Sequence, residues 1–575
     1  MAGTAAPADP AGPAGRLGRA AAEVFGWSRL RPGQLEAMEH VLAGRDTLVV
    51  MPTGAGKSAV YQVPALLLPG PTVVVSPLIA LQRDQVEALH RRHAPGAVAV
   101  NSARTGGETA AAWEAVRAGD VEYLFLAPEQ LAKDEVVERL ARAGPSLFVV
   151  DEAQCVSSWG YDFRPDYLRL GQVVRRLGRP VVLALTATAS PPVREEIAGR
   201  LGMERPAQVV AGFDRPNLRL EVRRFTDDRG KRRAVVERAA AQDGPGIVYT
   251  ATRKDAETCA AELAAAGLSA AAYHAGLPPA ERSRVHGAFL DGGVDVVVAT
   301  SAFGMGIDKP DVRFVLHASA PGSPDAYYQE IGRAGRDGAP ATAVLHYRPE
   351  DLALQKFFAS GHPDTAALAD VAARVHACGA PLSPTRLLEE TGLSAHRLTS
   401  AVGLLEQAGA VTTTAGGDLL PVGDLRPAEA AARAAGLAEA RRSLGRSRVE
   451  MMRGYAETTG CRRRYLLGYF GEDYEAPCGN CDNCDAAVRE GRTARPRREA
   501  GDGAGRKTGP EPGGHAFRTG ARVRHRQWGE GTVLGAEQDR VTVLFDSVGY
   551  RTLSLAAVAG RGLLVPVAGP AAGPE

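Results

Sequence analysis

Met51-Pro-Thr-Gly-Ala-Gly-Lys-Ser58 follows directly on the apolar run Thr47-Leu-Val-Val-Met51. The apolar run predicts a buried strand that delivers a glycine loop and a lysine to the start of a helix. Backbone N–H groups of such a loop surround phosphate oxygens, Lys57 reaches the terminal phosphates, and Ser58 can ligate Mg2+. Strict patterns of this loop carry Gly where Met51 stands. A nucleoside triphosphate site is therefore favoured over a simple tight turn, and its expected contacts are Thr53, Gly54, Ala55, Gly56, Lys57 and Ser58.

The chain has 575 residues, more than one hydrophobic core usually organises, so several domains are expected. Its net charge is only +2, so any nucleic-acid site has to be a local basic patch. No segment approaches about 18 uninterrupted apolar residues, and the Ala/Pro/Gly-rich first segment lacks the apolar core of a signal peptide. We expect a cytoplasmic protein that does not enter a membrane.

Short apolar runs alternate with helix-like stretches from about Leu30 to Gln208, which predicts a parallel sheet with helices on both faces. The runs are Thr47–Met51, Thr72–Ser76, Tyr123–Leu126, Leu147–Asp151 and Val181–Leu185. A second series starts near Pro216 without another Gly-Lys-Ser loop, and its runs are Gly246–Thr250, Ser269–Tyr273, Asp295–Thr300, Arg313–His317 and Ala341–His346. The fold class is therefore α/β, with one lobe that holds phosphates and a second that closes on them.

Helical patterns replace this alternation after about Pro363. The segments Ser383–Gly392 and Ser394–Gly409, followed by two short strand-like runs, are typical of a winged helix, with a plain helical spacer as the alternative. A segment rich in Gly, Arg and Pro over 486–514 predicts a flexible linker. The residues after it regain β character and predict a small barrel.

Asp151-Glu152-Ala153-Gln154 follows an apolar strand about a hundred residues after the glycine loop. Asp151 is expected to hold Mg2+, directly or through water, and Glu152 to orient and deprotonate the attacking water. An isolated Asp-Glu pair is more often a solvated acidic strand end. The glycine loop upstream makes the catalytic interpretation the better one.

A second cluster of charge lies in Tyr327-Tyr-Gln-Glu-Ile-Gly-Arg-Ala-Gly-Arg-Asp-Gly338, which carries Arg333 and Arg336. Arginines supplied by a second lobe can neutralise charge that develops on the γ-phosphate, which couples hydrolysis to motion. Without the first lobe, a surface arginine pair would explain this segment equally well.

Further motifs occur in order along the chain. They are Phe25-Gly-Trp27, Arg31-Pro-Gly-Gln34, the glycine loop, Ser76-Pro-Leu-Ile-Ala-Leu-Gln-Arg-Asp-Gln85, Asp151 to Gln154, Trp159-Gly-Tyr-Asp-Phe-Arg-Pro-Asp-Tyr167, Leu185-Thr-Ala-Thr-Ala189, Phe303-Gly-Met-Gly-Ile-Asp-Lys-Pro310 and the segment with Arg333 and Arg336. Taken together, these motifs resemble those of the RecQ family of superfamily 2 DNA helicases. The resemblance covers about residues 16 to 350 and a later cluster of cysteines.

The resemblance implies two RecA-like lobes and an ATP-dependent DNA helicase of repair and recombination that moves 3′ to 5′. It implies that Trp27 stacks on the base, Arg31 supports the nucleotide and Gln34 reads the adenine edge. Further expected cofactor contacts are Gly306, Asp308 and Gln329. The residues expected to contact single-stranded or forked DNA are Ser76, Pro77, Gln82, Trp159, Phe163, Arg164, Thr186, His274 and Thr300.

Four of the seven cysteines, Cys461, Cys478, Cys481 and Cys484, occur at spacings that can close a tetrahedral structural Zn2+ site. Cys461-Arg-Arg, Tyr469-Phe-Gly-Glu472 and Cys478-Gly-Asn-Cys-Asp-Asn-Cys484 also resemble the zinc subdomain of the RecQ family. The predicted domains are a disordered N-terminus over 1–15, lobe 1 over 16–210, lobe 2 over 211–360, a winged-helix-like region over 364–425, a helical zinc subdomain over 427–485, the linker, and a small Tudor-like barrel over 515–575.

The sequence also departs from the family pattern. Gln154 stands where the family commonly has His, which puts the coupling of hydrolysis to DNA in doubt, and Asp308 replaces a frequent Asn. The wing-like region precedes the cysteines rather than following them, so a strand-separating hairpin is uncertain. The tail, with Trp528-Gly-Glu-Gly-Thr-Val533, resembles the C-terminal module of UvrD/PcrA helicases, which contacts RNA polymerase. A generic barrel that touches the DNA backbone is the alternative.

Two other functions compete with a DNA helicase. The same motor could remodel RNA, although the aromatic loop and the zinc cluster argue against that. The chain could instead be a transcription-linked adaptor in which ATP turnover is residual. The cofactors expected under the favoured hypothesis are ATP, Mg2+ and Zn2+.

Overall fold

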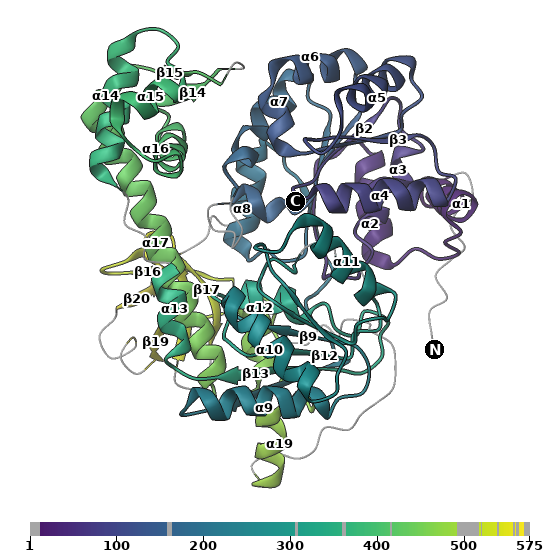
Figure 1. Ribbon diagram of the computed structural model, residues 1–575, viewed down its shortest axis with the longest axis vertical. Coiled ribbons are helices and arrows are strands. Elements are labelled where there is room, and N and C mark those ends of the chain that lie inside the picture. Colours follow the sequence, from purple (N-terminus) through teal and green to yellow (C-terminus); the bar gives the residue numbers. More distant parts are fainter. Residues whose placement is uncertain are drawn as a thin grey trace. The chain divides into compact units, whose positions relative to one another are not determined.

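The computed structural model describes residues 12–157, 164–304, 307, 309–358, 364–414, 417–491, 517–518, 520–536, 540–555, 558 and 563–567 (Figure 1). The chain divides into two compact units. One unit comprises Met1–Gly212 and Gly361–Arg441, and the other comprises Phe213–Ser360 and Arg442–Glu575. None of the described helices is both long enough and apolar enough to cross a membrane.

The first unit contains a seven-stranded sheet in the order β3-β4-β2-β5-β6-β1-β7, and every neighbouring pair is parallel. Its strands are β1 Thr47–Val50, β2 Thr72–Val75, β3 Ala97–Val100, β4 Tyr123–Leu126, β5 Leu147–Val150, β6 Val181–Thr186 and β7 Ala207–Val210. Its first eight α-helices are α1 Pro13–Phe25, α2 Pro32–Leu42, α3 Ala59–Ala65, α4 Ile79–Arg91, α5 Gly106–Ala118, α6 Asp134–Ala143, α7 Leu170–Arg176 and α8 Pro191–Leu201, with 3-10 turns η1 Pro128–Ala132, η2 Ala153–Val156 and η3 Pro165–Arg169.

Alternate strand residues of this sheet form the core with the N-terminal helices. Val49 and Leu185 from the sheet pack with Leu17, Met38 and Val60 from α1, α2 and α3. Because side chains alternate across a strand, this face collects the odd-numbered residues of β1 and β6. The first two helices are thereby anchored beside the glycine loop.

The later part of the first unit has its own hydrophobic core. It contains α14 Thr365–Cys378, α15 Pro384–Thr391, α16 Ala395–Gln407, an antiparallel hairpin of β14 Val411–Thr413 and β15 Leu419–Pro421, and the start of α17 Pro427–Glu457. The helices and the hairpin lie where the winged-helix prediction placed them. Arg169 Nη2 forms an ion pair of 2.5 Å with Glu406 Oε1 of α16, which ties this region to η3.

The second unit contains a six-stranded parallel sheet in the order β10-β11-β9-β12-β13-β8. Its strands are β8 Leu218–Arg224, β9 Gly246–Tyr249, β10 Ala270–Tyr273, β11 Val296–Ala299, β12 Phe314–His317 and β13 Ala341–Tyr347. Its helices are α9 Asp228–Ala240, α10 Arg253–Ala265, α11 Pro279–Leu290, α12 Pro324–Ile331, α13 Asp351–Phe358, α18 Arg462–Tyr469 and α19 Asp482–Arg489. Helix α19 runs into the segment expected to be a linker.

The tail forms an antiparallel sheet in the order β19-β18-β17-β16-β20. The strands are β16 Arg522–His525, β17 Gly529–Ala536, β18 Arg540–Phe545, β19 Gly549–Ser554 and β20 Leu564–Pro566. Val523, Val533, Val543 and Phe545 form its separate core. Among the described strands no pairing joins β19 to β20, so the expected closure into a barrel remains a prediction.

Candidate nucleotide site and zinc centre

The glycine loop lies between β1 and α3, where the sequence placed it. Gly54 and Gly56 both have a φ of 79°, in the left-handed region that favours glycine. A Cβ atom at Gly56 would lie 2.6 Å from Gln34 Nε2, so a side chain there would displace that amide. Lys57 Nζ donates a hydrogen bond of 3.2 Å to the carbonyl of Met51 and thereby folds back over the loop.

Helix α2 and the residue that precedes it, Arg31, supply two side chains that hold this loop. Gln34 Nε2 donates to the carbonyls of Ala55 at 3.0 Å and Gly56 at 2.9 Å, and Arg31 Nη1 donates to the carbonyl of Gly54 at 3.1 Å. Gln34 is buried, and its Oε1 accepts from the backbone N–H of Arg31. The two residues expected at the nucleotide therefore lie at the glycine loop and determine its shape.

Two aromatic and packing contacts complete this end of the first sheet. Trp27 stacks on Phe25 with ring centroids 4.6 Å apart, and the Arg92 guanidinium lies 5.1 Å from the Trp27 ring. Met51 is buried, and its N–H donates to the Thr186 carbonyl at 3.1 Å. The side chain that replaces the usual glycine thus faces the core and leaves the loop open.

The acidic motif follows β5 at the end of the sheet, where Asp151 and Glu152 are partly exposed and Ala153 and Gln154 are buried. Burial and the neighbouring Glu152 charge raise the pKa of Asp151 to about 7, while Lys57 opposes this shift. Asp151 Oδ1 accepts from the Glu152 N–H at 3.0 Å, and Tyr167 Oη donates to the Asp151 carbonyl at 3.2 Å. Carboxylate and hydroxyl oxygens suit Mg2+, so Asp151 and Ser58 fit the expected metal.

Gln154 links this motif to strand β6. Its Nε2 donates to Glu152 Oε2 at 2.7 Å, and its Oε1 accepts from Thr186 Oγ1 at 2.6 Å. Gln154 and Thr186 are almost completely buried. The amide in place of the usual histidine therefore joins the expected catalytic carboxylate to the next strand by two direct hydrogen bonds.

Several residues expected at DNA lie around this network. Gln82 is fully buried, donates to the Ser76 carbonyl at 2.8 Å and accepts from Asn101 at 2.8 Å. Arg164 Nη1 donates to the Pro77 carbonyl at 3.2 Å. Because the Gln82 and Thr186 side chains do not reach the surface, their positions suit the support of Ser76 and Gln154 rather than direct contact with a ligand. Trp159, Phe163, Gly306 and Asp308 lie outside the described residues.

In the second unit, Arg333 and Arg336 lie on a tightly braced turn after α12. Arg333 is buried beside the Tyr249 phenol, and Arg336 Nη1 donates to the Ile307 carbonyl at 2.6 Å. Arg215 donates to the carbonyls of Gly332, Ala334 and Gly335 at 3.3, 2.8 and 2.9 Å. Sequence reasoning did not single out Arg215, because nothing in its local pattern reveals a contact across more than a hundred residues.

The other residues of the second unit that we expect to bind nucleotide or DNA differ in how far they are buried. Gln329 is buried on α12, and His274 is buried with its Nε2 at 3.0 Å from Glu257 Oε1. Thr300 is partly exposed at the end of β11, where its Oγ1 accepts weakly from the Ala302 N–H at 3.5 Å. Of these three residues, Thr300 is the most exposed.

The four expected zinc ligands converge, with their Sγ atoms all within 4.8 Å of one another. Backbone N–H groups of Asn480 and Cys484 each lie 3.4 Å from the thiols of Cys478 and Cys481, respectively. Hydrogen bonds with neighbouring thiols hold the pKa of Cys461 below its ordinary value. Four thiolates without an open position suit a structural Zn2+.

Residues 461–484, which carry the four cysteines and are called the zinc segment below, cover the edge strand β8 of the second sheet. The Leu220 N–H donates to the Asn480 carbonyl at 3.2 Å, and the Val222 N–H donates to Asp482 Oδ2 at 2.9 Å. Arg463 donates to Asp214 at 2.6 Å and to the Leu218 carbonyl at 2.7 Å. Because an open sheet edge exposes unpaired backbone groups, the cysteine segment completes this sheet.

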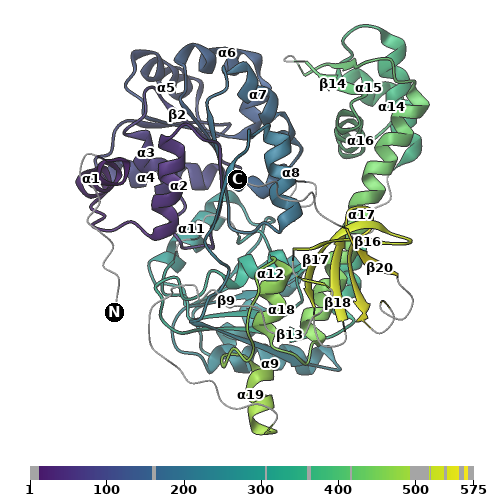
Figure 2. The same ribbon diagram turned by 180° about the vertical axis from the view of Figure 1, so that it is seen from behind.

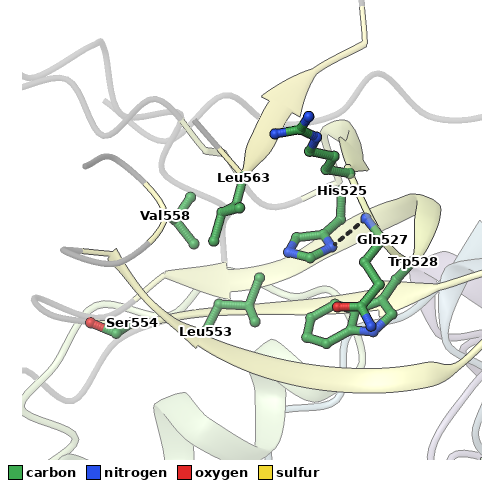
Figure 3. A pocket seen from close by; sticks show the side chains of 8 residues that line it. His525, Gln527, Trp528, Leu553, Ser554, Val558 and Leu563 are labelled. Carbon is green, nitrogen blue, oxygen red and sulfur yellow. Dashed lines mark hydrogen bonds between the residues drawn. The ribbon is translucent and has the colours of Figure 1, made fainter. Parts of the chain in front are cut away.

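A cavity of about 530 Å³ lies in the tail sheet, and none of its lining residues is one that we expect to bind nucleotide (Figure 3). Its lining residues are His525, Arg526, Gln527, Trp528, Leu553, Ser554, Val558 and Leu563. His525 stacks on Trp528 with centroids 4.1 Å apart, and His525 Nδ1 accepts from the Gln527 N–H at 3.2 Å. The cavity therefore has an aromatic wall next to an exposed arginine, Arg526.

Three family models match the chain: DEAD/DEAH box helicase over residues 31–197, helicase conserved C-terminal domain over 230–338, and RecQ zinc-binding over 423–485. The probable ATP-dependent DNA helicase RecS of Bacillus subtilis is 36% identical over 471 residues, which cover 80% of this chain and 90% of that protein. The ATP-dependent DNA helicase RecQ of Pasteurella multocida is 36% identical over 463 residues, which cover 80% of this chain and 61% of that protein. The three matched segments end before the tail sheet.

Replacement of Gln154 tests its link between Glu152 and Thr186. Gln154→Ala removes a donor and an acceptor from a buried site, and we expect the maximal rate of nucleotide hydrolysis to fall about tenfold or more while nucleotide affinity stays nearly constant. Gln154→His restores a donor and an acceptor, but imidazole titrates near pH 6.5. Its rate should therefore depend on pH between 6 and 8 more steeply than that of the wild type. Equal rates in Gln154→Ala and wild type would contradict the proposed link.

Loss of the zinc site should open the edge of the second sheet. We expect Cys481→Ser to speed hydrogen exchange at the Leu220 and Val222 amides by about tenfold or more, because their carbonyl and carboxylate partners lie on the zinc segment. Exchange in β1 and β6 should stay unchanged. Cys378→Ser, at a cysteine outside the cluster, is the matched control. Protection of β8 that survives in Cys481→Ser would show that the edge does not depend on the metal site.

Proposed function

Because this chain belongs to the RecQ family of ATP-dependent DNA helicases, we propose that it moves 3′ to 5′ on single-stranded DNA and unwinds tailed or forked duplexes in repair and recombination. The observation that supports this most directly is the hydrogen-bonded chain from Glu152 through Gln154 to Thr186, beside the loop that carries Lys57. Hydrolysis of a phosphoanhydride needs a positioned water and neutralised charge more than covalent help. This end of the first sheet carries a carboxylate, Glu152, that would orient the water, and a lysine, Lys57, that would neutralise charge.

The residues of the first unit that we expect at the nucleotide have distinct proposed roles. Lys57 and the loop amides hold the phosphates, Asp151 and Ser58 hold Mg2+, and Glu152 accepts a proton from the attacking water. Mg2+ would supply charge neutralisation and orient the phosphates, and its positive charge would keep Asp151 ionised despite burial. The remaining proposed nucleotide contacts are Trp27, Arg31, Gln34, Thr53, Gly54, Ala55 and Gly56.

The second unit is proposed to contribute positive charge to the same reaction. Arg333 and Arg336 would stabilise the charge that develops on the γ-phosphate. Further proposed nucleotide contacts are Gly306, Asp308 and Gln329. The proposed DNA contacts are Ser76, Pro77, Trp159, Phe163, Arg164, His274 and Thr300, with Gln82 and Thr186 supporting their neighbours. Such contacts go mainly to phosphates and base faces, so binding should tolerate sequence changes and weaken with salt.

Glu152→Gln tests the proposed catalytic base. The amide keeps the size of the side chain but cannot accept the proton, so we expect the DNA-stimulated maximal rate to fall about a hundredfold or more with little change in ATP affinity. Glu114→Gln, at an exposed position of α5, is the matched control. Hydrolysis of ATP at the wild-type rate by Glu152→Gln would contradict the assignment of Glu152 as the catalytic base.

Unwinding assays distinguish the proposed function from RNA remodelling. We expect 3′-tailed and forked DNA duplexes to be unwound, 5′-tailed duplexes to resist, and single-stranded DNA to stimulate ATP hydrolysis more than RNA does. Stronger stimulation by RNA, or unwinding only of 5′-tailed DNA, would contradict the proposal. Absence of any polynucleotide-stimulated hydrolysis would contradict the helicase function itself.

The tail sheet favours a second, separate role in binding a protein partner, for which we propose RNA polymerase. The aromatic wall of its cavity and the exposed Arg526 support a protein contact, since aromatic and arginine side chains are enriched in protein interfaces. We expect Arg526→Glu to reduce capture of purified RNA polymerase by the full chain about tenfold. Thr552→Ala, at an exposed position of the same sheet, should not. Equal capture of RNA polymerase by Arg526→Glu and Thr552→Ala would contradict a contact at Arg526.

A further inference from the structure

The tail sheet packs on helices of the zinc-binding region within the second unit, and both views show its strands beside the C-terminal half of α17 (Figure 2). The Leu534 carbonyl of β17 lies next to Gly468 of α18, at an ordinary contact distance of 3.6 Å from the place a Cβ atom would take there. No matched family segment extends into the tail sheet. The contact is therefore a feature that the RecQ resemblance does not explain.

The contact is built around two tyrosines. Tyr550 of β19 stacks on Tyr469 of α18 with ring centroids 4.9 Å apart and an interplanar angle of 21°, and both rings are buried. Gly549 has a φ of 73°, and a Cβ atom there would lie 2.5 Å from Ser447 Oγ of α17. Only glycine fits this position without a shift, so the turn before Tyr550 is shaped for the helix that it meets.

Beneath the two rings lies a buried group of charged residues. Tyr469 Oη donates a hydrogen bond to Asp325 Oδ2 of α12. Arg448 of α17 is buried and interacts electrostatically with Asp325, Tyr469 and Tyr550. Burial raises the pKa of Asp325, while Arg448 and the Tyr469 hydrogen bond oppose that shift. Because interactions among buried charges are strong only where water is excluded, the Tyr550 ring helps to keep this group intact.

Helix α12 connects that group to the expected catalytic arginines. Asp325 lies in its first turn, where Ser323 caps the helix, and Tyr327 on the same helix lies 3.2 Å from Tyr455 through the two hydroxyls. The turn that bears Arg333 and Arg336 follows directly after the helix ends at Ile331. A displacement of α12 would therefore move the arginine turn.

We infer that Tyr550 and Tyr469 are positioning residues for ATP hydrolysis: the tail sheet holds α12, and through it Arg333 and Arg336, in the arrangement that the reaction needs. This inference rests on the proposed function, because it assigns those arginines to the γ-phosphate. It gives the tail sheet a role within the chain that is separate from any partner bound at the Trp528 cavity.

The test uses the full, zinc-loaded chain with single-stranded DNA. We expect Tyr550→Ala to lower the maximal rate of ATP hydrolysis about tenfold, since small displacements of catalytic groups cost this much or more, while the KM for ATP changes less than about twofold. Tyr550→Phe keeps the ring stack and should retain a rate within about twofold of the wild type. Thr552→Ala, exposed on the same strand, is the matched control.

Hydrogen exchange supplies a readout that does not depend on activity. Amides of α12 and α18 should exchange faster in Tyr550→Ala than in Tyr550→Phe or Thr552→Ala, with β1 and β6 unchanged. If Tyr550→Ala does not fold, Tyr469→Phe keeps the ring but removes the hydroxyl that contacts Asp325 and Arg448, and it should still lower the rate with the KM for ATP unchanged.

Two results would overturn the inference. The first is a wild-type rate of ATP hydrolysis in Tyr550→Ala, or in Tyr469→Phe if Tyr550→Ala does not fold. The second is a reduced rate in that variant without any change in hydrogen exchange of the α12 amides. A wild-type chain that shows no DNA-stimulated hydrolysis would instead contradict the proposed function. The exchange measurement would then still report whether the tail sheet holds α12.

Discussion

The parallel register of β1, β5 and β6 places every expected catalytic group of the first unit at the carboxyl ends of these neighbouring strands. Val50 pairs with Thr186 and Val150 pairs with Ala184, so the residues after β1 and β5 emerge beside the end of β6. The carboxyl ends of parallel strands are where such sheets bind ligands. Short direct hydrogen bonds such as those of Gln154 require this register, since a slip by one residue would send each side chain to the opposite face.

The second unit is organised by a different constraint, the burial of charged groups that need partners. Arg462 pairs with Asp482 within the zinc segment, whereas Arg463 of the zinc segment pairs with Asp214, which precedes β8. Removing one member of a buried pair leaves an uncompensated charge and is strongly destabilising. The zinc segment is therefore part of the second lobe in structural terms, because it satisfies both the edge of β8 and these charges.

Much of this architecture was predictable from sequence because buried parallel strands are continuous apolar runs. The ten runs expected in the two lobes all coincide with strands, and the four cysteines converge as their spacing indicated. In the two lobes, the strands that were missed are β3, β7 and β8, which lie at sheet edges. In β7 and β8 partial exposure interrupts the apolar run, and β3 is short and half alanine.

Contacts between distant segments were beyond sequence reasoning for a physical reason. The motif around Gln34 predicted proximity to a nucleotide, but its bonds to the loop carbonyls depend on how α2 packs on the first sheet. Arg215 and Tyr550 lie outside any local motif, and their partners are separated from them by more than 80 residues. Periodicity and spacing describe neighbours along the chain, whereas these contacts arise only after the sheets and helices have packed.

Glu152 shows how the local backbone and the catalytic site depend on each other. Its φ of 49° and ψ of 48° are in the left-handed region, which costs a residue with a side chain about 1–2 kcal/mol. Glycine would relieve that strain but would remove the carboxylate on which the proposed reaction depends. The hydrogen bonds from the Glu152 N–H to Asp151 and from Gln154 to the Glu152 carboxylate offset the strain. The strained conformation is thus maintained by the same side chains that the site needs for its chemistry.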